Sequence, residues 1–219
     1  MNNSFSNSNA IKSFNTTLRI EGDKSLSIRW ALLASQASGK SCAKNILKSG
    51  DVLSTLECLR KLGVKIKLNK DECEIKGMGI NGYKYKKVTV LNAGNSGTLA
   101  RLILGLLIHS KDKIKIVGDK SLSKRDFLRV IAPLEKFGAK FISNKNKLPI
   151  IIKGTKNPKP IKYLENKGSA QCKTAIMLAS LNTLGTTVIK AKKSRNHTEL
   201  LFKYLKLPIK IIEKKDYDL

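Results

Sequence analysis

One eight-residue sequence occurs twice in this chain, and it constrains the fold because it indicates a duplicated unit. GDKSLSIR at residues 22–29 returns as GDKSLSKR at residues 118–125. Helical spacing gives a second sign of repetition, since three predicted helices begin at Ser25, Gly97 and Ser169, which lie 72 residues apart (97 − 25 and 169 − 97). Each carries a cation four residues later, at Arg29, Arg101 and Lys173. We therefore expect three copies of one structural unit.

Hydrophobic periodicity predicts a βαβαββ pattern in each copy. We expect helices at residues 25–38, 51–62, 98–108, 126–137, 170–181 and 196–207. We expect strands at residues 14–20, 41–47, 64–68, 73–75, 88–91, 113–117, 140–142, 149–152, 186–191 and 209–212. The second helix of each copy is predicted to begin at an N-cap, namely Asp51, Asp126 and Asn196. Because such elements cannot bury their apolar faces alone, we predict an α+β fold of three pseudo-symmetric units around a common helical core, with an incomplete third unit.

Composition limits the function classes. The 219 residues carry 43 Lys and Arg against 16 Asp and Glu, a formal net charge of +27, which favours anionic partners such as phosphorylated small molecules or nucleic acid. The longest apolar run, residues 102–108, is too short to span a bilayer, which takes about 20 residues. Residues 1–13 are polar, are expected to form a disordered leader, and contain no secretory signal, so we expect a cytoplasmic protein. The four cysteines and two histidines form no metal-ligand pattern, so we expect reduced thiols and no metal.

The start of each first helix has the composition of an anion site. Residues 94–98, Gly-Asn-Ser-Gly-Thr, combine two glycines with hydroxyl groups just before a helix, where free N–H groups and the helix dipole favour phosphate or carboxylate. Ser25 and Ser169 hold the same place in the other two copies. Arg125 and Arg195 precede the second helices and are expected to reach the same end of the domain. Converging guanidinium groups suit a bidentate grip on an anion.

Several of these sequences, in this order, resemble the 5-enolpyruvylshikimate-3-phosphate synthase (3-phosphoshikimate 1-carboxyvinyltransferase) family over residues 14–219. The matching stretches are residues 22–25 with Arg29, 91–98 with Arg101, 121–125, 169–171 and 195–199. In that family, two similar domains of three βαβαββ units close over shikimate 3-phosphate and phosphoenolpyruvate. The resemblance implies a transferase of the shikimate pathway, in aromatic amino acid biosynthesis, which adds an enolpyruvyl group to the 5-hydroxyl and releases phosphate without cofactor or metal.

The resemblance also implies a role for each matching residue. Lys24 would be catalytic, in contact with phosphoenolpyruvate and stabilising or protonating the charged intermediate. The residues that would hold shikimate 3-phosphate are Lys24, Ser25, Arg29, Ser169, Ala170, Gln171 and Arg195. The residues that would bind phosphoenolpyruvate are Lys24, Gly97, Arg125 and Gln171.

The family protein is about twice as long as this chain, so the resemblance implies an N-terminal fragment. Residues 14–21 would be a strand of the absent second domain, and residues 22–219 a substrate-binding domain with repeats at about 22–88, 89–160 and 161–219. In the family the second domain supplies further acidic and basic groups, so we expect the chain alone to be inactive and to need that domain as a partner. The family enzyme is usually monomeric.

Two other kinds of protein could share some of these features. A UDP-N-acetylglucosamine enolpyruvyl transferase would share the fold, but its reactive cysteine has no counterpart at residues 124–126, and the Lys-Ser-x-Ser-x-Arg pattern of residues 24–29 disfavours it. A basic nucleic-acid-binding module would interleave cations with aromatic side chains. Aromatic residues make up only 5% of the chain, and most phenylalanines occupy expected core positions, so we expect neither a nucleic-acid nor a membrane partner.

Overall fold

The computed structural model describes residues 17, 20–70 and 72–219. The first part of the chain contains α1 (Lys24–Gln36), β1 (Lys40–Lys44), α2 (Gly50–Lys61), β2 (Lys65–Leu68) and β3 (Glu72–Lys76). The middle part contains β4 (Thr89–Asn92), α3 (Gly97–Leu106), β5 (Ile114–Val117), the 3₁₀ turn η1 (Leu122–Lys124), α4 (Leu128–Lys136), β6 (Lys140–Asn144) and β7 (Lys147–Lys153). The last part contains β8 (Lys162–Glu165), α5 (Ala170–Ser180), β9 (Val188–Lys192), α6 (His197–Tyr204) and β10 (Tyr217–Asp218).

The strands form three sheets that repeat one topology. The middle sheet has the order β4-β5-β7-β6, in which β4 and β5 are parallel and the remaining pairs are antiparallel. The first sheet, β1-β3-β2, repeats the β5-β7-β6 part of that order. The third sheet, β8-β9-β10, repeats β4-β5-β7, including its parallel first pair. The predicted α+β fold of three related units is confirmed.

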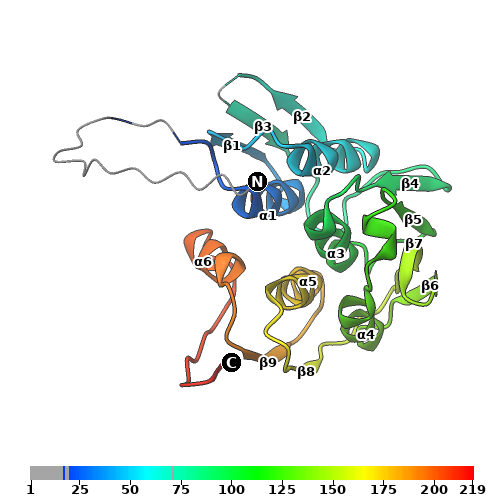
Figure 1. Ribbon diagram of the computed structural model, residues 1–219, viewed down its shortest axis with the longest axis vertical. Helices are drawn as coiled ribbons and strands as arrows, with labels where there is room; N and C mark the ends of the chain where they lie inside the picture. The colour runs from blue at the N-terminus through cyan, green and yellow to red at the C-terminus, as the bar shows by residue number, and fades with distance from the viewer. Residues whose placement is uncertain (1–16, 18–19, 71) are drawn as a thin grey trace, which may run out of the picture.

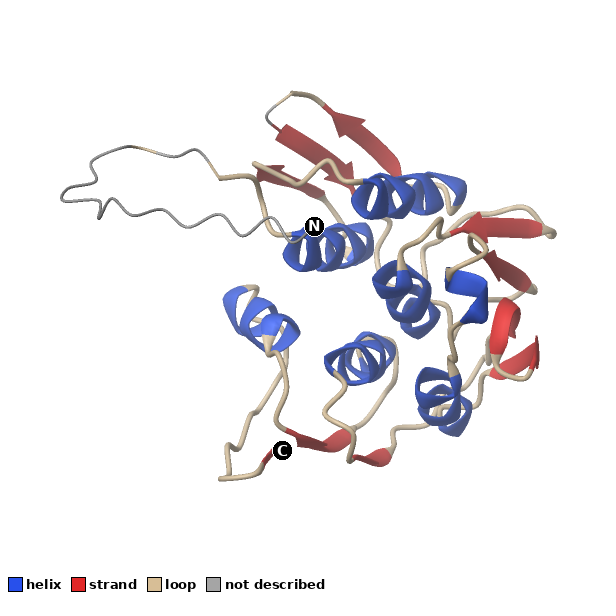
Figure 2. Ribbon diagram, viewed as in Figure 1, coloured by secondary structure: helices blue, strands red, loops and turns tan. Residues whose placement is uncertain are grey.

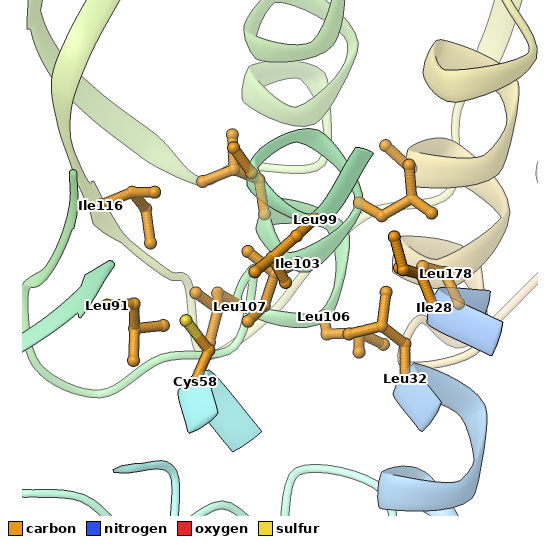
Figure 3. Close-up of a cluster of buried hydrophobic side chains, with 14 of the residues drawn as sticks. Ile28, Leu32, Cys58, Leu91, Leu99, Ile103, Leu106, Leu107, Ile116 and Leu178 are labelled. Atoms are coloured by element: carbon orange, nitrogen blue, oxygen red, sulfur yellow. The ribbon is translucent and has the colours of Figure 1, made fainter. Parts of the chain in front are cut away.

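The helices pack together, and the sheets lie around their outside (Figure 1). Figure 2 shows the same separation, with the strands at the periphery of the helical cluster. The strands alternate accordingly, so that β7 turns Leu148, Ile150 and Ile152 inward and its lysines outward. One hydrophobic core results, in which Ile28 of α1 and Leu178 of α5 lie beside the apolar face of α3 (Figure 3).

Helices α3 and α5 make the closest approach in this core. A β-carbon at Gly105 of α3 would lie 2.3 Å from the backbone carbonyl oxygen of Ala175 on α5, a distance that real β-carbons do not adopt. Glycine is therefore needed at position 105 so that the two helix backbones can touch. Around this contact, Leu102, Ile103 and Leu106 are buried almost completely.

The three first helices begin in the same way. Each has a side-chain N-cap that accepts a hydrogen bond from the backbone N–H three residues later: Asp23 from Leu26 (2.7 Å), Ser96 from Leu99 (3.2 Å) and Ser169 from Cys172 (3.2 Å). The caps lie 73 residues apart (96 − 23 and 169 − 96). The predicted repeat is thus present, although α1 begins at Lys24 rather than Ser25.

The repeated octet does not occupy equivalent places in the fold. Its first copy opens α1, whereas its second copy lies between β5 and α4 and forms only the short turn η1. Both copies nonetheless form the same capping turn, because Asp119 accepts from Leu122 N at 2.7 Å as Asp23 does from Leu26. The octet therefore encodes a local turn, and the helix spacing rather than the octet carries the three-fold repeat.

Several local predictions were wrong. Asp51 is not the N-cap of α2, because that helix begins earlier, after Ser49, and the Asp51 carboxylate pairs with Lys24 instead. Phe127 rather than Asp126 is the N-cap of α4; the Asp126 side chain accepts from Leu128 N two residues on. Asn196 does precede α6, as predicted.

The strand predicted at 209–212 is also wrong. That segment is a loop, and antiparallel pairing begins only at the bridge between Glu213 and Asp218, next to the paired backbones of Ile212 and Leu219. The strand predicted at 14–20 and the leader at 1–13 lie outside the described residues, apart from positions 17 and 20. No helix in the described part of the chain is long and apolar enough to cross a membrane.

Two helical glycines should respond in opposite directions to replacement by alanine. Gly105→Ala should lower the free energy of unfolding by about 1–3 kcal/mol, because its methyl group would force α3 away from α5. Gly50→Ala should raise it by about 0.4–1 kcal/mol, since the β-carbon there meets no described atom within 4 Å and reduces the entropy of the unfolded chain. Denaturant unfolding of both variants checks this. Equal effects of the two substitutions would contradict the close α3–α5 contact.

The cysteines should differ sharply in reactivity. Burial raises the pKa of the Cys73 thiol to about 11 and those of Cys58 and Cys172 to about 12. Desolvation and the nearby Glu72 and Glu74 also raise the pKa of Cys42, but this thiol alone of the four is exposed, on β1. Because the thiolate is the reactive form, iodoacetamide at pH 8 should label Cys42 alone in the folded protein and all four thiols in denaturant. Peptide mass spectrometry gives the sites. Rapid native labelling of Cys58 or Cys172 would show that the core is open.

Candidate functional site

The N-terminal ends of α1, α3 and α5 meet at one cavity of about 290 Å³. Eight of the predicted site residues line it: Lys24, Ser25, Arg29, Gly97, Arg125, Ala170, Gln171 and Arg195. The lining also includes Asp51, Asn95, Thr98 and His197. The ninth predicted residue, Ser169, is not part of the lining; it is the N-cap of α5 and directly precedes the lining residue Ala170. The fold thus brings together residues that are as much as 173 positions apart in the sequence (197 − 24).

Lys24 lies in the first turn of α1 and is half exposed. Its ammonium nitrogen is 3.0 Å from Oδ2 of Asp51, in the first turn of α2. The pair joins two helices across the mouth of the cavity. Because both side chains remain accessible to water, the ion pair contributes little to stability, and Lys24 can exchange this partner for a ligand at small cost.

Arg29 is buried beneath Lys24 and Ser25, with 4% of its surface exposed. It donates from Nε to the Thr198 hydroxyl (2.8 Å), from NH1 to the Ser25 carbonyl (3.1 Å) and from NH2 to the Thr174 hydroxyl (3.2 Å). Burial is the main cause that lowers the pKa of this guanidinium, and the nearby positive charge of Arg195 acts in the same direction. The group nevertheless stays charged, since arginine does not lose its proton in proteins. A buried positive charge therefore faces the cavity.

Two guanidinium groups converge on Gly97. A β-carbon there would lie 2.9 Å from NH1 of Arg101 and 3.1 Å from NH1 of Arg125. Glycine thus leaves room for both side chains beside the first turn of α3. Arg101 is additionally held over the ring of Phe127, with 4.8 Å between its guanidinium carbon and the ring centroid.

Gln171 is fixed by two hydrogen bonds of opposite polarity. Its Oε1 accepts from NH1 of Arg101 (3.1 Å), and its Nε2 donates to the Thr98 hydroxyl (3.1 Å). These bonds join the first turns of α3 and α5. Arg101 is further held by the carbonyl oxygens of Gly97 and Asp126.

The loop before α5 is held by a buried carboxylate. Glu165, 4% exposed, accepts from the backbone N–H groups of Lys167 (3.2 Å) and Ser169 (2.9 Å). The Ser169 side chain caps the helix, so it points toward the backbone of Cys172. Ala170, which follows it, lines the cavity at the start of α5.

The three repeated cations do not occupy equivalent places. Arg29 lines the cavity, whereas Arg101 bonds to Gln171 from outside the lining, and the buried ammonium group of Lys173 pairs with the Glu199 carboxylate of α6. The reason is geometric, because Arg29 stands six positions after its N-cap, Arg101 five and Lys173 four. A shift of one residue turns a helical side chain by about 100°.

Sequence reasoning misses two lining residues, Asp51, which it assigns as a helix cap, and His197. Asn95 and Thr98 lie in the predicted anion site at residues 94–98, although the sequence gives them no separate roles. His197 had no signal of its own, since it follows Arg195 at the start of a short helix. The ion pair with Lys24, the bond from Asn95 to Asp119 (2.5 Å) and the bond from Gln171 to Thr98 depend on contacts that no local pattern encodes.

The electrostatics of the cavity suit an anion. Four cations line it, namely Lys24, Arg29, Arg125 and Arg195, against one carboxylate, Asp51, which is already paired. Helix starts on three sides add free N–H groups and positive dipole ends. Within the described residues, no group of three or more His, Cys, Asp or Glu side chains could hold a metal ion. The arrangement can bind ligands that carry phosphate and carboxylate groups.

Comparisons with known proteins agree with this arrangement. The family model of EPSP synthase (3-phosphoshikimate 1-carboxyvinyltransferase) matches residues 8–217. The chain is 42% identical over 186 residues to 3-phosphoshikimate 1-carboxyvinyltransferases of Streptococcus pyogenes serotypes M2 and M1, a match that covers 84% of this chain and 43% of each relative. A solved EPSP synthase from Acinetobacter baumannii superposes with a TM-score of 0.83 and 33% identity, covering 92% of this chain and 45% of that one.

The chain spans about half the length of the relatives that it matches. The similarity nevertheless runs through all three helix starts that build the cavity, since the matched residues extend from 8 to 217. Sequence and fold lead to one assignment: the chain belongs to the EPSP synthase (3-phosphoshikimate 1-carboxyvinyltransferase) family.

Proposed function

We propose that this chain provides the shikimate 3-phosphate side of an enolpyruvyl transferase site. In the proposed reaction, the enolpyruvyl group of phosphoenolpyruvate passes to the 5-hydroxyl of shikimate 3-phosphate, and phosphate is released. The observation that carries the proposal is the meeting of three helix starts and four cations in one cavity with a single, paired carboxylate. Both substrates are anions, and this cavity offers charge and N–H donors to each.

Shikimate 3-phosphate is assigned to the side of the cavity formed by α1, α5 and the loop before α6. The proposed contacts in the cavity lining are Lys24, Ser25 and Arg29 on α1, Ala170 and Gln171 at the start of α5, and Arg195 in the loop before α6. Ser169, the N-cap of α5, is proposed as a further contact beside Ala170. Arg29 uses three of its five N–H groups in the bonds already described, which leaves one on each terminal nitrogen for the ligand.

Phosphoenolpyruvate is assigned to the side formed by α3 and the turn η1. The proposed contacts are Gly97, Arg125, Lys24 and Gln171, all of which line the cavity. Because Gly97 has no β-carbon, the space beside the Arg125 guanidinium on this side of the cavity stays open. Lys24 stands where it can reach both ligands, so its ammonium group can stabilise charge that develops between them and hold a proton there.

Transfer also requires groups that move protons within hydrogen-bond reach of the reacting atoms. Among the described lining residues, Asp51 is the one carboxylate, and it is paired with Lys24. We therefore propose that the segment corresponding to the other half of the relatives completes the site as a partner domain, and that the chain alone does not turn over. We predict that the complete enzyme is cytoplasmic and monomeric. We also predict that it binds neither nucleic acid nor membranes.

Calorimetric titration with shikimate 3-phosphate tests the binding proposal. We expect saturable binding that shikimate, which lacks the phosphate, does not reproduce. Arg29→Ala should abolish measurable binding, because it removes a buried charge from the ligand side of the cavity. Arg60→Ala is the matched control, since Arg60 is an exposed arginine on α2 that pairs with Glu57. No binding by folded wild-type protein, or equal loss in both variants, would refute the assignment.

Gly97→Ala tests the phosphoenolpyruvate side. Its methyl group would push against the guanidinium groups of Arg101 and Arg125, so we expect a loss of phosphoenolpyruvate affinity of about tenfold, roughly one charge-assisted hydrogen bond. Affinity for shikimate 3-phosphate should change less than threefold. Titration of the shikimate 3-phosphate complex with phosphoenolpyruvate separates the two effects, with Gly50→Ala as the control. A larger effect on shikimate 3-phosphate would reverse the two assignments.

A further inference from the structure

The buried Arg29 is held by neutral groups. Its three hydrogen bonds go to two threonine hydroxyls and one backbone carbonyl. Among the contacts of the described residues, it has no carboxylate in direct contact. This is unusual for an arginine that is 4% exposed, because buried charges are generally paired. An arginine held in this way keeps its full positive charge for a ligand.

The two hydroxyls form a network whose direction is determined by the available protons. Thr174 donates its one proton to the Ala170 carbonyl at 2.7 Å. Thr174 and Thr198 oxygens are 2.6 Å apart, so Thr198 must donate in that bond. Both oxygens then have lone pairs left for Arg29, and each threonine uses its single donor. The network is fully satisfied only when both positions carry a hydroxyl group.

Two carboxylates act on Arg29 through space, and the one with the stronger effect, Glu199, is paired with a lysine; the weaker one is Asp23. Glu199 follows Thr198 on α6 and acts on Arg29 through space, yet it is buried and paired with Lys173, which is buried as well. Lys173 precedes Thr174 on α5. Each threonine that holds the arginine is therefore next to a charged residue in the sequence. These two charged neighbours, Lys173 and Glu199, neutralise each other.

We propose that Thr174 and Thr198 are positioning residues that hold Arg29 through neutral acceptors, so that its charge stays available to the anionic substrate, while Lys173 keeps Glu199 from neutralising it. This inference rests on the proposed function for its choice of ligand. It extends the site to α6, which contributes through Thr198 without touching the ligand. Three helices from two units of the fold, α1 of the first and α5 and α6 of the third, would then cooperate at one guanidinium.

Paired substitutions test the role of the hydroxyls. Thr198→Val and Thr174→Val keep the shape and remove the acceptor, so each should weaken shikimate 3-phosphate binding by about tenfold, the loss typical of one charge-assisted hydrogen bond. Thr198→Ser and Thr174→Ser restore the acceptor and should stay within threefold of wild type. Thr183→Val is the matched control, since Thr183 is a buried threonine whose hydroxyl donates to the Ala179 carbonyl and has no other described partner. Thermal unfolding verifies that each variant is folded.

A second measurement needs no ligand. The Nε–H of Arg29, assigned in ¹⁵N–¹H spectra by its loss in Arg29→Lys, should exchange with water more slowly than that of exposed Arg60. Thr198→Val should remove this protection, and Thr198→Ser should keep it. The inference is wrong if the Nε–H of Arg29 in the wild-type protein exchanges as fast as that of Arg60. This outcome does not depend on whether the valine variants fold. The inference is also wrong if folded valine variants bind as tightly as wild type, or if serine variants lose as much as valine variants.

The two proposals fail in different ways. A wild-type protein that does not bind shikimate 3-phosphate, but protects Arg29 Nε–H through Thr198, would refute the substrate and retain the positioning network. A protein that binds shikimate 3-phosphate with an unprotected Arg29 would retain the substrate and refute the network.

Glu199→Gln adds a test of the charge argument: removal of the carboxylate should leave affinity for shikimate 3-phosphate unchanged or higher, and a tenfold loss would contradict the neutralising role of Lys173.

Discussion

The contact between α3 and α5 at Gly105 is the constraint on which the rest of the site depends. Because Gly105 has no side chain, the backbone of α3 reaches the Ala175 carbonyl, and the two helices lie closer than any other residue would permit. Their capped first turns are thereby held together. Gln171 can then bond both Arg101 and Thr98, and the cavity takes its shape from packing that lies one to two turns below it.

Charge is arranged around this packing so that positive groups remain available. Two carboxylates close to these cations each pair with a lysine, Asp51 with Lys24 and Glu199 with Lys173. The buried pair is costly to desolvate and is poor evidence for stability by itself. The effect of this ion pair is electrostatic, because Lys173 neutralises the charge of Glu199 beside the guanidinium of Arg29. An anion that enters the cavity therefore meets cations held by neutral groups.

Much of the fold and of the candidate site could be predicted from the sequence. Apolar periodicity and glycine placement gave most helices and strands, and family resemblance gave eight of the residues that line the cavity. The errors have physical causes. Aspartate is a residue type that favours the N-cap position, but the carboxylate of Asp51 forms an ion pair with Lys24 of another helix. Lys173 had the spacing of Arg29, but it stands two residues closer to its N-cap, so its side chain leaves the cavity and pairs with Glu199.

The sequence by itself determined the local turns and the alternation of buried and exposed positions, since these depend on neighbours a few residues away. The repeated octet illustrates this, because both copies form the same Asp-capped turn although one continues as α1 and the other stops at η1. Only the tertiary structure decided which side chains meet. Thr198 lies 169 residues from Arg29, and their hydrogen bond exists because packed helices place them together, which no local pattern can encode.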